Sequence, residues 1–237
     1  MRSRSISVML VDDHAVVREG YRRLLEKHEG ITVVAEAADA AGAYQAYKNK
    51  LPDVVVMDVS LPGRGGIDAI RQIRQWDPAA RLLVFTMHLS APFALQAFRA
   101  GAKGFVTKSS PPELLVSAVC DVAAGGVAIC PEISEAVARN HLQGDAGAID
   151  SLSPREFEIL RMLLDGRSVE EIAAAFNLSP KTVSNYHYAI KSKLSVSSDV
   201  ELVLFGLRSG LITRVEERQF PICLTARSMP FGPRWPR

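Results

Sequence analysis

The sequence has little net charge and few cysteines. Its 28 basic and 26 acidic side chains leave a formal charge of +2 over 237 residues, which is too small to indicate a nucleic-acid-binding protein by itself. Any DNA-binding surface must therefore come from the local placement of charge. The three cysteines, Cys120, Cys130 and Cys223, are far apart and lack the spacing of a metal site. We expect them to be small apolar residues in a reducing cytosol.

Long apolar runs are also missing. The N-terminal segment, MRSRSISVMLVDD, has a run of only about six apolar residues before its aspartates, which is too short for the core of a signal peptide. No other run approaches the roughly 18 residues that a membrane helix needs. We therefore expect a cytoplasmic protein.

What is present, over residues 6–124, is an alternation of short apolar runs with helical patterns. Because parallel strands need crossover connections, this order predicts a parallel sheet covered on both faces. Continuously apolar runs such as VMLV and LLVF are typical of strands that are buried on both faces. The pattern predicts a doubly wound, flavodoxin-like α/β domain with a five-stranded parallel sheet over residues 1–125. The predicted strands are 6–11, 31–37, 54–57, 82–86 and 104–107, and the predicted helices are 15–26, 40–49, 66–75, 92–100 and 112–124.

A second, all-helical region follows. Gly125 and Gly126 end the alternation, and we expect an extended or partly helical linker over 126–150. Ser153-Pro154-Arg155-Glu156 is a capping box with proline at the first helical position. It opens a four-helix domain over 151–213, with helices predicted at 154–165, 169–176, 180–194 and 199–209. Residues 214–237 are rich in proline and arginine and predict a poorly ordered tail.

Polar residues end four of the predicted strands. Asp12 and Asp13 follow the first strand, Asp58 follows the third, Thr86 ends the fourth, and Lys108 comes just after the fifth. In an open parallel sheet these ends share one edge, where ligands bind. Three carboxylates in one crevice repel one another, and a bound cation relieves this repulsion. Oxygen ligands suit Mg²⁺. Capping of the next helix is an alternative role for the first two aspartates.

This arrangement resembles the receiver domain of bacterial response regulators over about residues 6–125. The matching stretches are VDDH at 11–14, DVVVMDVSLPG at 53–63, FTMH at 85–88 and GAKGFVTKS at 101–109. The resemblance implies that a histidine kinase transfers a phosphoryl group to Asp58. It also implies that Mg²⁺ is held by Asp12, Asp13, Asp58 and the carbonyl of Ser60, that Lys108 pairs with the acyl phosphate, that Thr86 hydrogen-bonds it, and that Phe105 turns inward as an aromatic switch.

Three features bear on the lifetime of such a phosphate. Ser60 and His88 each lie two residues after a pocket residue, and in receivers such positions face the phosphoryl group. We expect His88 to modulate hydrolysis, with a plain surface role as the alternative. The loop at 61–66 is rich in glycine and carries Arg64 close to the site. For Phe105, the alternative is an ordinary core aromatic residue.

Residues 168–194 carry the pattern of a helix-turn-helix. Ser179 caps the second helix, with Pro180 at its first position. From 180 to 194 there are three lysines and no acidic residue, so a nearly neutral domain can still present a basic face. A small helical protein-interaction bundle is the alternative interpretation.

The region 151–212 resembles the LuxR-type helix-turn-helix of the NarL/FixJ response regulators. The matching stretches are LSPREFEILRMLLDG, IAAAFNLSPKTVSNYHYAIKSKL and DVELVLF, and SPKTV followed by Tyr186 is nearest to the GacA/UvrY-like group. The resemblance implies that DNA lies near Lys181, Thr182, Ser184, Asn185 and His187, and that Lys191 contacts a backbone phosphate. Packing between helices is an alternative role for His187.

Together these features predict a two-component response regulator. Phosphorylation of Asp58 would control dimerisation and sequence-specific binding to double-stranded DNA, and the protein would not be an enzyme beyond dephosphorylating itself. The 199–209 helix offers Val200, Val203, Leu204 and Leu207 as a homodimer surface, unless they pack within the domain. Two alternatives remain, a receiver-fold phosphatase with an acyl-aspartate intermediate, and a DNA-binding protein that works without phosphorylation. The intact pocket disfavours the latter, and the helix-turn-helix disfavours the former.

Overall fold

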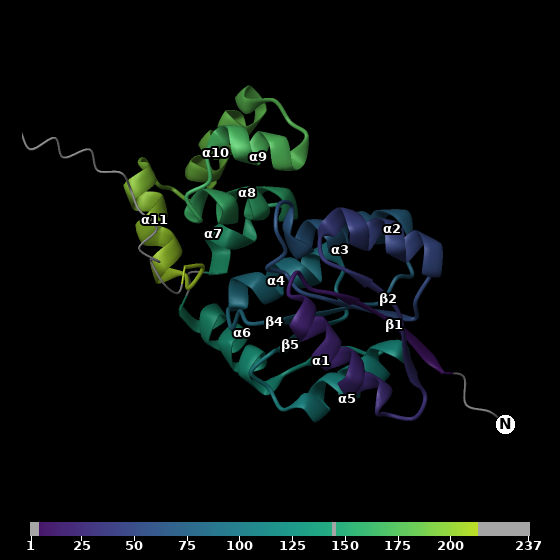
Figure 1. Ribbon diagram of the computed structural model, residues 1–237. Coiled ribbons are helices and arrows are strands. Elements are labelled where there is room, and N and C mark those ends of the chain that lie inside the picture. The colour runs from purple at the N-terminus through teal and green to yellow at the C-terminus, as the bar shows by residue number, and fades with distance from the viewer. Residues whose placement is uncertain (1–4, 144–145, 213–237) are drawn as a thin grey trace, which may run out of the picture.

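The computed structural model describes residues 5–143 and 146–212, which form an N-terminal α/β domain and a C-terminal helical domain (Figure 1). The α/β domain is built on one parallel sheet with the strand order β2-β1-β3-β4-β5-β6. Crossover helices connect the strands, as parallel pairing requires. The strands are β1 (Ile6–Val11), β2 (Ile31–Ala37), β3 (Val54–Met57), β4 (Leu82–Thr86), β5 (Gly104–Thr107) and β6 (Ala128–Ile129).

Helices cover both faces of this sheet, because successive residues of a strand point to opposite sides. On β1, Val8 and Leu10 belong to the core shared with α1 and α5, whereas Met9 and Val11 belong to the core shared with α2, α3 and α4. The central strand β3, VVVM, is therefore apolar and buried at every position. The helices are α1 (Ala15–Glu26), α2 (Ala40–Lys50), α3 (Gly65–Trp76), α4 (Ala91–Ala100) and α5 (Pro112–Ala123).

The predicted doubly wound parallel fold and its five strands are confirmed, and the sheet has one further strand that was not predicted. The sixth, β6, pairs with β5 inside the segment that we expected to be a linker. Two helices follow it, α6 (Pro131–Gln143) and α7 (Ala146–Asp150), and Cys130 and Ile133 are buried in the core. A strand of two residues directly after two glycines has no apolar periodicity to reveal it.

The helical domain contains α8 (Pro154–Leu164), α9 (Val169–Phe176), α10 (Pro180–Lys193) and α11 (Asp199–Arg208), each within one residue of its predicted bounds. A serine begins each helix by accepting a backbone N–H of the first turn. The capping box at Ser153 and Glu156 is confirmed, and a second one, at Ser168 and Glu171, was not predicted. These caps fix where the helix-turn-helix begins.

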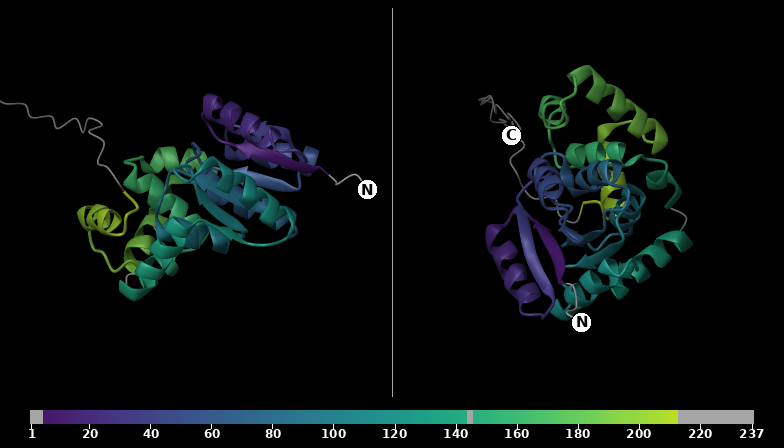
Figure 2. Two further views of the ribbon diagram at one scale, coloured as in Figure 1. Left: turned by 90° about the horizontal axis from the view of Figure 1, so that it is seen from below. Right: turned by 90° about the vertical axis from the view of Figure 1, so that its right-hand side faces the viewer.

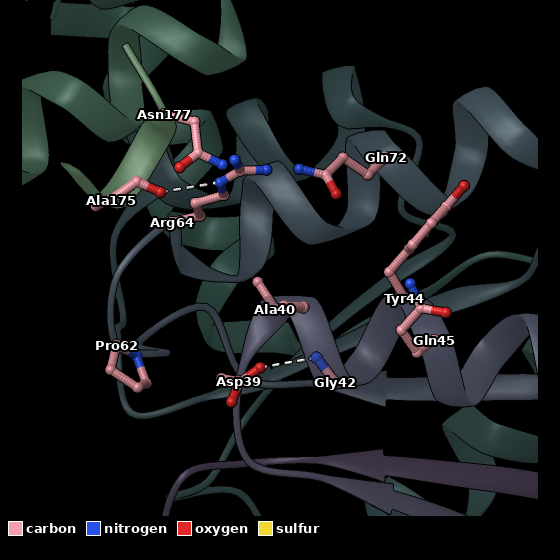
Figure 3. A pocket seen from close by; sticks show the side chains of 11 residues that line it. Asp39, Ala40, Gly42, Tyr44, Gln45, Pro62, Arg64, Gln72, Ala175 and Asn177 are labelled. Atoms are coloured by element: carbon pink, nitrogen blue, oxygen red, sulfur yellow. Dashed lines mark hydrogen bonds between the residues drawn. The ribbon is translucent and has the colours of Figure 1, made fainter. Parts of the chain in front are cut away.

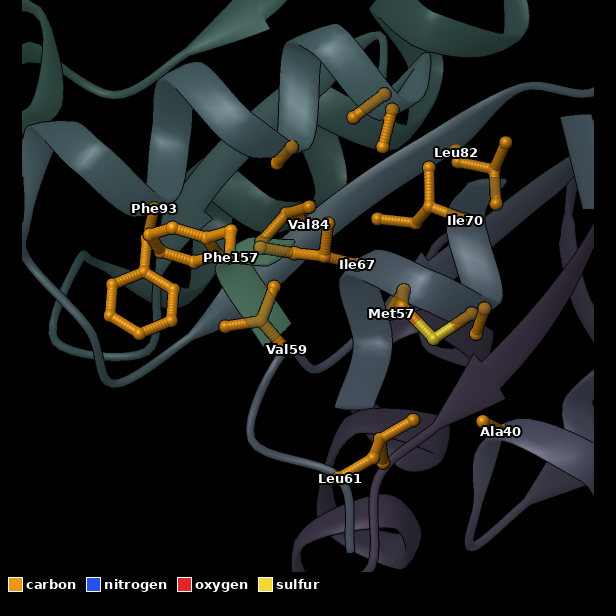
Figure 4. Packing of buried hydrophobic residues seen from close by; sticks show 14 of the residues in the cluster. Ala40, Met57, Val59, Leu61, Ile67, Ile70, Leu82, Val84, Phe93 and Phe157 are labelled. Atoms are coloured by element: carbon orange, nitrogen blue, oxygen red, sulfur yellow. The ribbon is translucent and has the colours of Figure 1, made fainter. Parts of the chain in front are cut away.

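The two domains share one hydrophobic core. The hydrophobic cluster that contains the buried residues of α3 and α4 also contains those of α8 and α9. Figure 2 shows the helical domain lying against that side of the α/β domain. Phe93 of α4 and Phe157 of α8 meet there with their ring centroids 5.2 Å apart (Figure 4). Gln96, which is fully buried, donates to the backbone carbonyls of Ile149 and Leu152. The domains are therefore packed together and not merely tethered.

Three further predictions concern the cysteines, the C-terminal tail and the absence of a membrane helix. Cys120 and Cys130 are free thiols, whereas Cys223 and the predicted tail at 214–237 lie outside the described residues. Among the helices of the described residues, none is long and apolar enough to cross a bilayer.

Candidate functional site

An acidic pocket lies at the carboxyl edge of the sheet. Val11 lies opposite Met57 in the β1–β3 register, so the next residues, Asp12 and Asp58, come side by side. Both aspartates are buried, and the Lys108 ammonium donates to a carboxylate oxygen of each. Burial alone would lower the pKa of Lys108, but the Asp58 and Asp12 carboxylates raise it above its usual 10.5. The pocket therefore holds a charged ammonium between two carboxylates.

The remaining predicted metal ligands lie at the rim of this pocket. Asp13 is exposed, and its Oδ1 lies 2.8 Å from Nδ1 of His14. Ser60 donates its backbone N–H to Oδ1 of Asp58 at 2.9 Å, which fixes one oxygen of that carboxylate. Ligand atoms of Asp12, Asp13 and His14 all lie within 4.8 Å of one another. The carboxylates provide the hard oxygen donors that Mg²⁺ prefers, so the residues present fit that ion.

The predicted switch residues line the next two strands. Thr86 is fully buried, and its carbonyl accepts the backbone N–H of Lys108 at 2.8 Å. Phe105 is also fully buried, opposite Val84 in the β4–β5 register. Its ring points into the core, which fits both an inward switch position and the ordinary core role that we kept as the alternative.

His88 is not the plain surface residue of the alternative interpretation. Its backbone N–H donates to Oγ1 of Thr86 at 3.4 Å, and its ring stacks on Phe93 with centroids 4.4 Å apart. Burial lowers the pKa of His88 below its usual 6.5, against an opposing effect of the Asp58 carboxylate. The imidazole is therefore neutral at pH 7. The sequence placed His88 near the pocket but gave no sign of its stacking.

The exposed face of α10 carries most of the residues that the sequence assigned to DNA. Lys181, Ser184 and Asn185 are exposed, and Thr182 is half-buried beside the cap, where its N–H donates to Ser179. Val183 and Ile190 are buried on the opposite face. The helix-turn-helix thus presents its polar face outward.

Two of the three lysines of α10 are engaged by acidic side chains. Lys191 and His187 both lie against Asp199 of α11, with N–O distances of 3.1 and 2.9 Å, and together they lower the pKa of Asp199. Lys193 pairs with Glu156 of α8 at 2.7 Å. In the described parts of the chain, no acidic side chain forms an ion pair with Lys181. The free positive charge of the helix is therefore concentrated near its N-terminus.

A network of charges crosses the domain boundary, and sequence reasoning missed it. Glu158 of α8 is fully buried beside α3, and Arg161 donates to its Oε2 at 2.9 Å. Burial raises the pKa of Glu158, and Arg161 opposes this rise. Arg155 of α8 lies 3.6 Å from Asp68 of α3, which is itself fully buried. In the sequence these residues look like ordinary helix-surface charges, so no pattern marks them as interdomain contacts.

A cleft of about 730 Å³ opens at the edge of this boundary, between α2, the loop before α3 and the end of α9 (Figure 3). Arg64 crosses it and donates from Nε to the carbonyl of Ala175 at 3.0 Å. Asp39 accepts the backbone N–H of Gly42 at 2.7 Å and so caps α2. The glycine-rich loop after Asp58 is thus tied to the helical domain through Arg64.

Comparisons with known proteins match both domains. Residues 8–120 match the response regulator receiver domain, and residues 150–205 match the luxR family of bacterial regulatory proteins. The chain is 39% identical over 208 residues to the response regulator UvrY of Escherichia coli, covering 87% of this chain and 95% of UvrY. It is 39% identical over 209 residues to the response regulator GacA of Pseudomonas aeruginosa, covering 87% and 98%.

A solved structure matches as well. RcsB of Salmonella enterica serovar Typhimurium, bound to a promoter in the presence of the phosphomimetic BeF3−, is 28% identical and superimposes with a TM-score of 0.69 over 85% of this chain and 98% of RcsB. Another RcsB structure holds two dimers on two parallel DNAs. The family resemblance that the sequence motifs indicated is therefore confirmed.

Proposed function

Because this chain belongs to the two-component response regulators that join a receiver domain to a LuxR-type DNA-binding domain, we propose that phosphorylation of Asp58 by a sensor histidine kinase controls its binding to DNA. The observation that carries this proposal is the position of the Lys108 ammonium, which donates to both Asp58 and Asp12 at the carboxyl edge of the sheet. An oxygen of Asp58 forms the new bond to phosphorus while the phosphorus–nitrogen bond to the kinase histidine breaks. Such a transfer depends mainly on positioning and charge neutralisation.

Each pocket residue has a place in this step. Asp12, Asp13, Asp58 and the Ser60 carbonyl would hold Mg²⁺, which supplies positive charge beside the transferred group when it is bound. Lys108 neutralises a further phosphoryl oxygen. The Ser60 N–H already orients the Asp58 carboxylate, so the acceptor oxygen is preorganised.

The response to phosphorylation would start at Thr86. Its hydroxyl now accepts the His88 backbone N–H at 3.4 Å, which is a long hydrogen bond. The same hydroxyl can donate its own proton to a phosphoryl oxygen on Asp58, and such charge-assisted hydrogen bonds are the stronger ones. Movement of Thr86 toward the phosphate frees space for Phe105 behind it. The signal is thus a change in packing caused by local charge.

The DNA-binding part follows from the polar face of α10. Lys181, Ser184 and Asn185 are exposed and would reach base edges or phosphates, with Thr182 beside them. His187 and Lys191 would have to exchange Asp199 for a phosphate. RcsB is solved as dimers on DNA, and α11 of this chain exposes Val200, Val203, Leu204 and Leu207. We assign this face to a homodimer that reads two half-sites.

The protein would act in the cytoplasm, where its DNA lies, and would lose its phosphate by self-catalysed hydrolysis. Incubation with acetyl phosphate and Mg²⁺ tests the proposal. Mass spectrometry should show one added phosphoryl group, which Asp58→Asn abolishes. Asp39→Asn is the matched control, because Asp39 also follows a strand but caps α2, and it should leave phosphorylation intact. Modification that persists in Asp58→Asn would refute the assignment of the acceptor.

A further inference from the structure

The imidazole of His88 is the first of three rings that contact one another in series across the domain boundary. His88 lies parallel to Phe93, with an interplanar angle of 11°. Phe93 meets Phe157 edge-to-face, at 87°. The first two rings belong to the receiver domain, whereas Phe157 belongs to the DNA-binding domain. Offset stacked and edge-to-face arrangements are the favourable geometries for such rings.

Phe157 supports the stack through its edge-to-face contact with Phe93. Phe93 and Phe157 are each only 1% exposed, and Figure 4 shows the two rings adjacent in the shared core. If Phe157 were absent, one side of Phe93 would border a cavity or water, and Phe93 could no longer fix the His88 ring in one orientation. Close-packed cores transmit such a loss to the next side chain.

Charges of both domains also reach His88. Asp58 and Lys108 act on it from the pocket, and Arg161 of α8 and Asp165, the C-cap of that helix, act on it from the other domain. Burial has the largest effect and keeps the ring neutral at pH 7. A neutral imidazole can accept a hydrogen bond, which an imidazolium cannot. The docked DNA-binding domain therefore supplies both a ring of the stack that holds this side chain and charges that act on it.

We propose that Phe157 is a positioning residue for hydrolysis of the phosphoaspartate, acting through Phe93 on His88, so that the docked DNA-binding domain sets the lifetime of the phosphate. This inference rests on the proposed phosphorylation of Asp58. In this arrangement the rate of hydrolysis does not depend on the receiver domain alone, because a core residue of the DNA-binding domain helps to position His88.

The chemical step is the hydrolysis of an acyl phosphate, which is a mixed carboxylic–phosphoric anhydride. The oxygen of a water molecule forms a bond to phosphorus, and the bond between phosphorus and the Asp58 oxygen breaks. Asp58 leaves as a carboxylate, and inorganic phosphate carries the water oxygen away. The neutral His88 ring accepts a hydrogen bond from the attacking water and takes up its proton, which then passes to solvent. Correct placement of the ring matters because small misplacements of such groups slow reactions strongly.

The test measures the loss of the phosphoryl group from the full-length chain after acetyl phosphate has been removed. Phe157→Leu should lengthen the phosphate lifetime by about tenfold, as expected for a misplaced catalytic group, and His88→Ala should lengthen it at least as much. The double variant should be no slower than His88→Ala alone, because both changes act through the same ring. Phe176→Leu is the matched control, since Phe176 is a similarly buried aromatic of the same domain whose ring lies under Arg155. It should leave the lifetime unchanged.

Two further measurements separate positioning from general damage. Phe93→Leu interrupts the stack from the receiver side and should reproduce the slow hydrolysis, so the test does not depend on the folding of one variant. The pH profile of hydrolysis should shift its lower inflection upward in Phe157→Leu, because a better hydrated His88 titrates nearer its usual pKa. A lifetime in Phe157→Leu and Phe93→Leu equal to that of the wild type, or additive effects in the double variant, would overturn the inference. Failure of the wild-type chain to accept phosphate on Asp58 would instead overturn the proposed function together with it.

Discussion

Gly65 of α3 and Glu158 of α8 touch each other across the domain boundary, and a Cβ atom on Gly65 would overlap the Glu158 carboxylate. The next glycine, Gly66, lies against the backbone carbonyl of Asp58, where a Cβ atom would also overlap. Two successive glycines thus let the backbone approach the phosphoacceptor on one side and the DNA-binding domain on the other. The segment that follows Asp58 therefore packs directly against the DNA-binding domain.

Gly65→Ala should loosen the interdomain contact. Gly65 and Gly63 both have left-handed backbones, with φ of +72° and +73°, but nothing lies within 4 Å of a Cβ on Gly63. Gly63→Ala should therefore lower the free energy of unfolding by about 1 kcal/mol through backbone strain alone. Gly65→Ala should lower it by roughly 2–3 kcal/mol, because overpacking adds to the strain.

Urea denaturation measures this difference, and amide exchange in α8 should rise only in the Gly65 variant. Combining Gly65→Ala with Glu158→Ala removes the overlapping carboxylate and should recover part of the extra loss. Equal losses at the two glycines would show that Glu158 does not press on Gly65 in solution.

Glu158→Gln should remove a pH dependence of stability. Burial raises the pKa of Glu158 above its usual 4.5, so the folded chain holds this proton more tightly than the unfolded chain does. The resulting stabilisation is present at low pH and is lost as pH rises through the raised value. The glutamine stays neutral, so the free energy of unfolding of the variant, relative to that of the wild type, should increase as pH rises above about 4.5.

Glu171→Gln provides a control of opposite sign. The Ser168 backbone N–H lowers the pKa of Glu171, so the wild-type carboxylate stabilises at neutral pH and this effect fades as pH falls. Thermal unfolding from pH 4 to 8 would reveal both trends. Parallel curves for wild type and Glu158→Gln would contradict a raised pKa.

Most helices and strands, and the polar residues at the strand ends, could be predicted from the sequence because both depend on short-range patterns. Asp12, Asp58 and Lys108 each follow an apolar run, and parallel pairing brings the ends of such runs to one edge. Ser153 and Ser179 marked helix starts to the residue. The two-residue strand β6 was missed, because periodicity needs more residues than Ala128–Ile129 provide.

The domain boundary could not be predicted for a different reason. Phe93 and Phe157 each satisfy the apolar pattern of their own helix, and nothing in that pattern says that the two rings meet. Likewise, the charge of Lys193 is visible in the sequence, but its pairing with Glu156 depends on how α8 and α10 cross. Long-range packing decides these contacts, and a single sequence does not encode them locally.

Lys108→Met should destabilise the chain and make it more responsive to Mg²⁺. The Lys108 side chain is 8% exposed, and removing it leaves the buried Asp12 and Asp58 carboxylates without their cation. Loss of one partner from such a buried arrangement costs about 3–5 kcal/mol. Mg²⁺ that binds only the folded chain should restore part of this stability.

Thermal unfolding with and without MgCl₂ checks the prediction. The rise in melting temperature on adding Mg²⁺ should be larger in Lys108→Met than in the wild type. Lys103→Met, at an exposed lysine of the same domain, should behave like the wild type in both conditions. An equal response of Lys108→Met and wild type to Mg²⁺ would argue against a shared site for the ammonium and the metal.

Lys181 and Lys193 should differ in their contribution to DNA binding, although both are lysines of α10. Lys181 lies exposed at the N-terminal end of the helix, whereas Lys193 is held by Glu156 at 2.7 Å. Each phosphate contact that a lysine makes releases counterions, and its loss lowers the slope of log affinity against log salt by about 0.9. Lys181→Ala should therefore weaken binding and flatten this slope by about one unit. Lys193→Ala should leave the slope unchanged, because the charge it removes is already neutralised within the domain.

Fluorescence anisotropy with a labelled promoter fragment over a range of salt concentrations measures both slopes. If Lys193→Ala flattened the slope and Lys181→Ala did not, the C-terminal end of α10 would face the phosphates, and the orientation of the helix on DNA proposed above would be reversed.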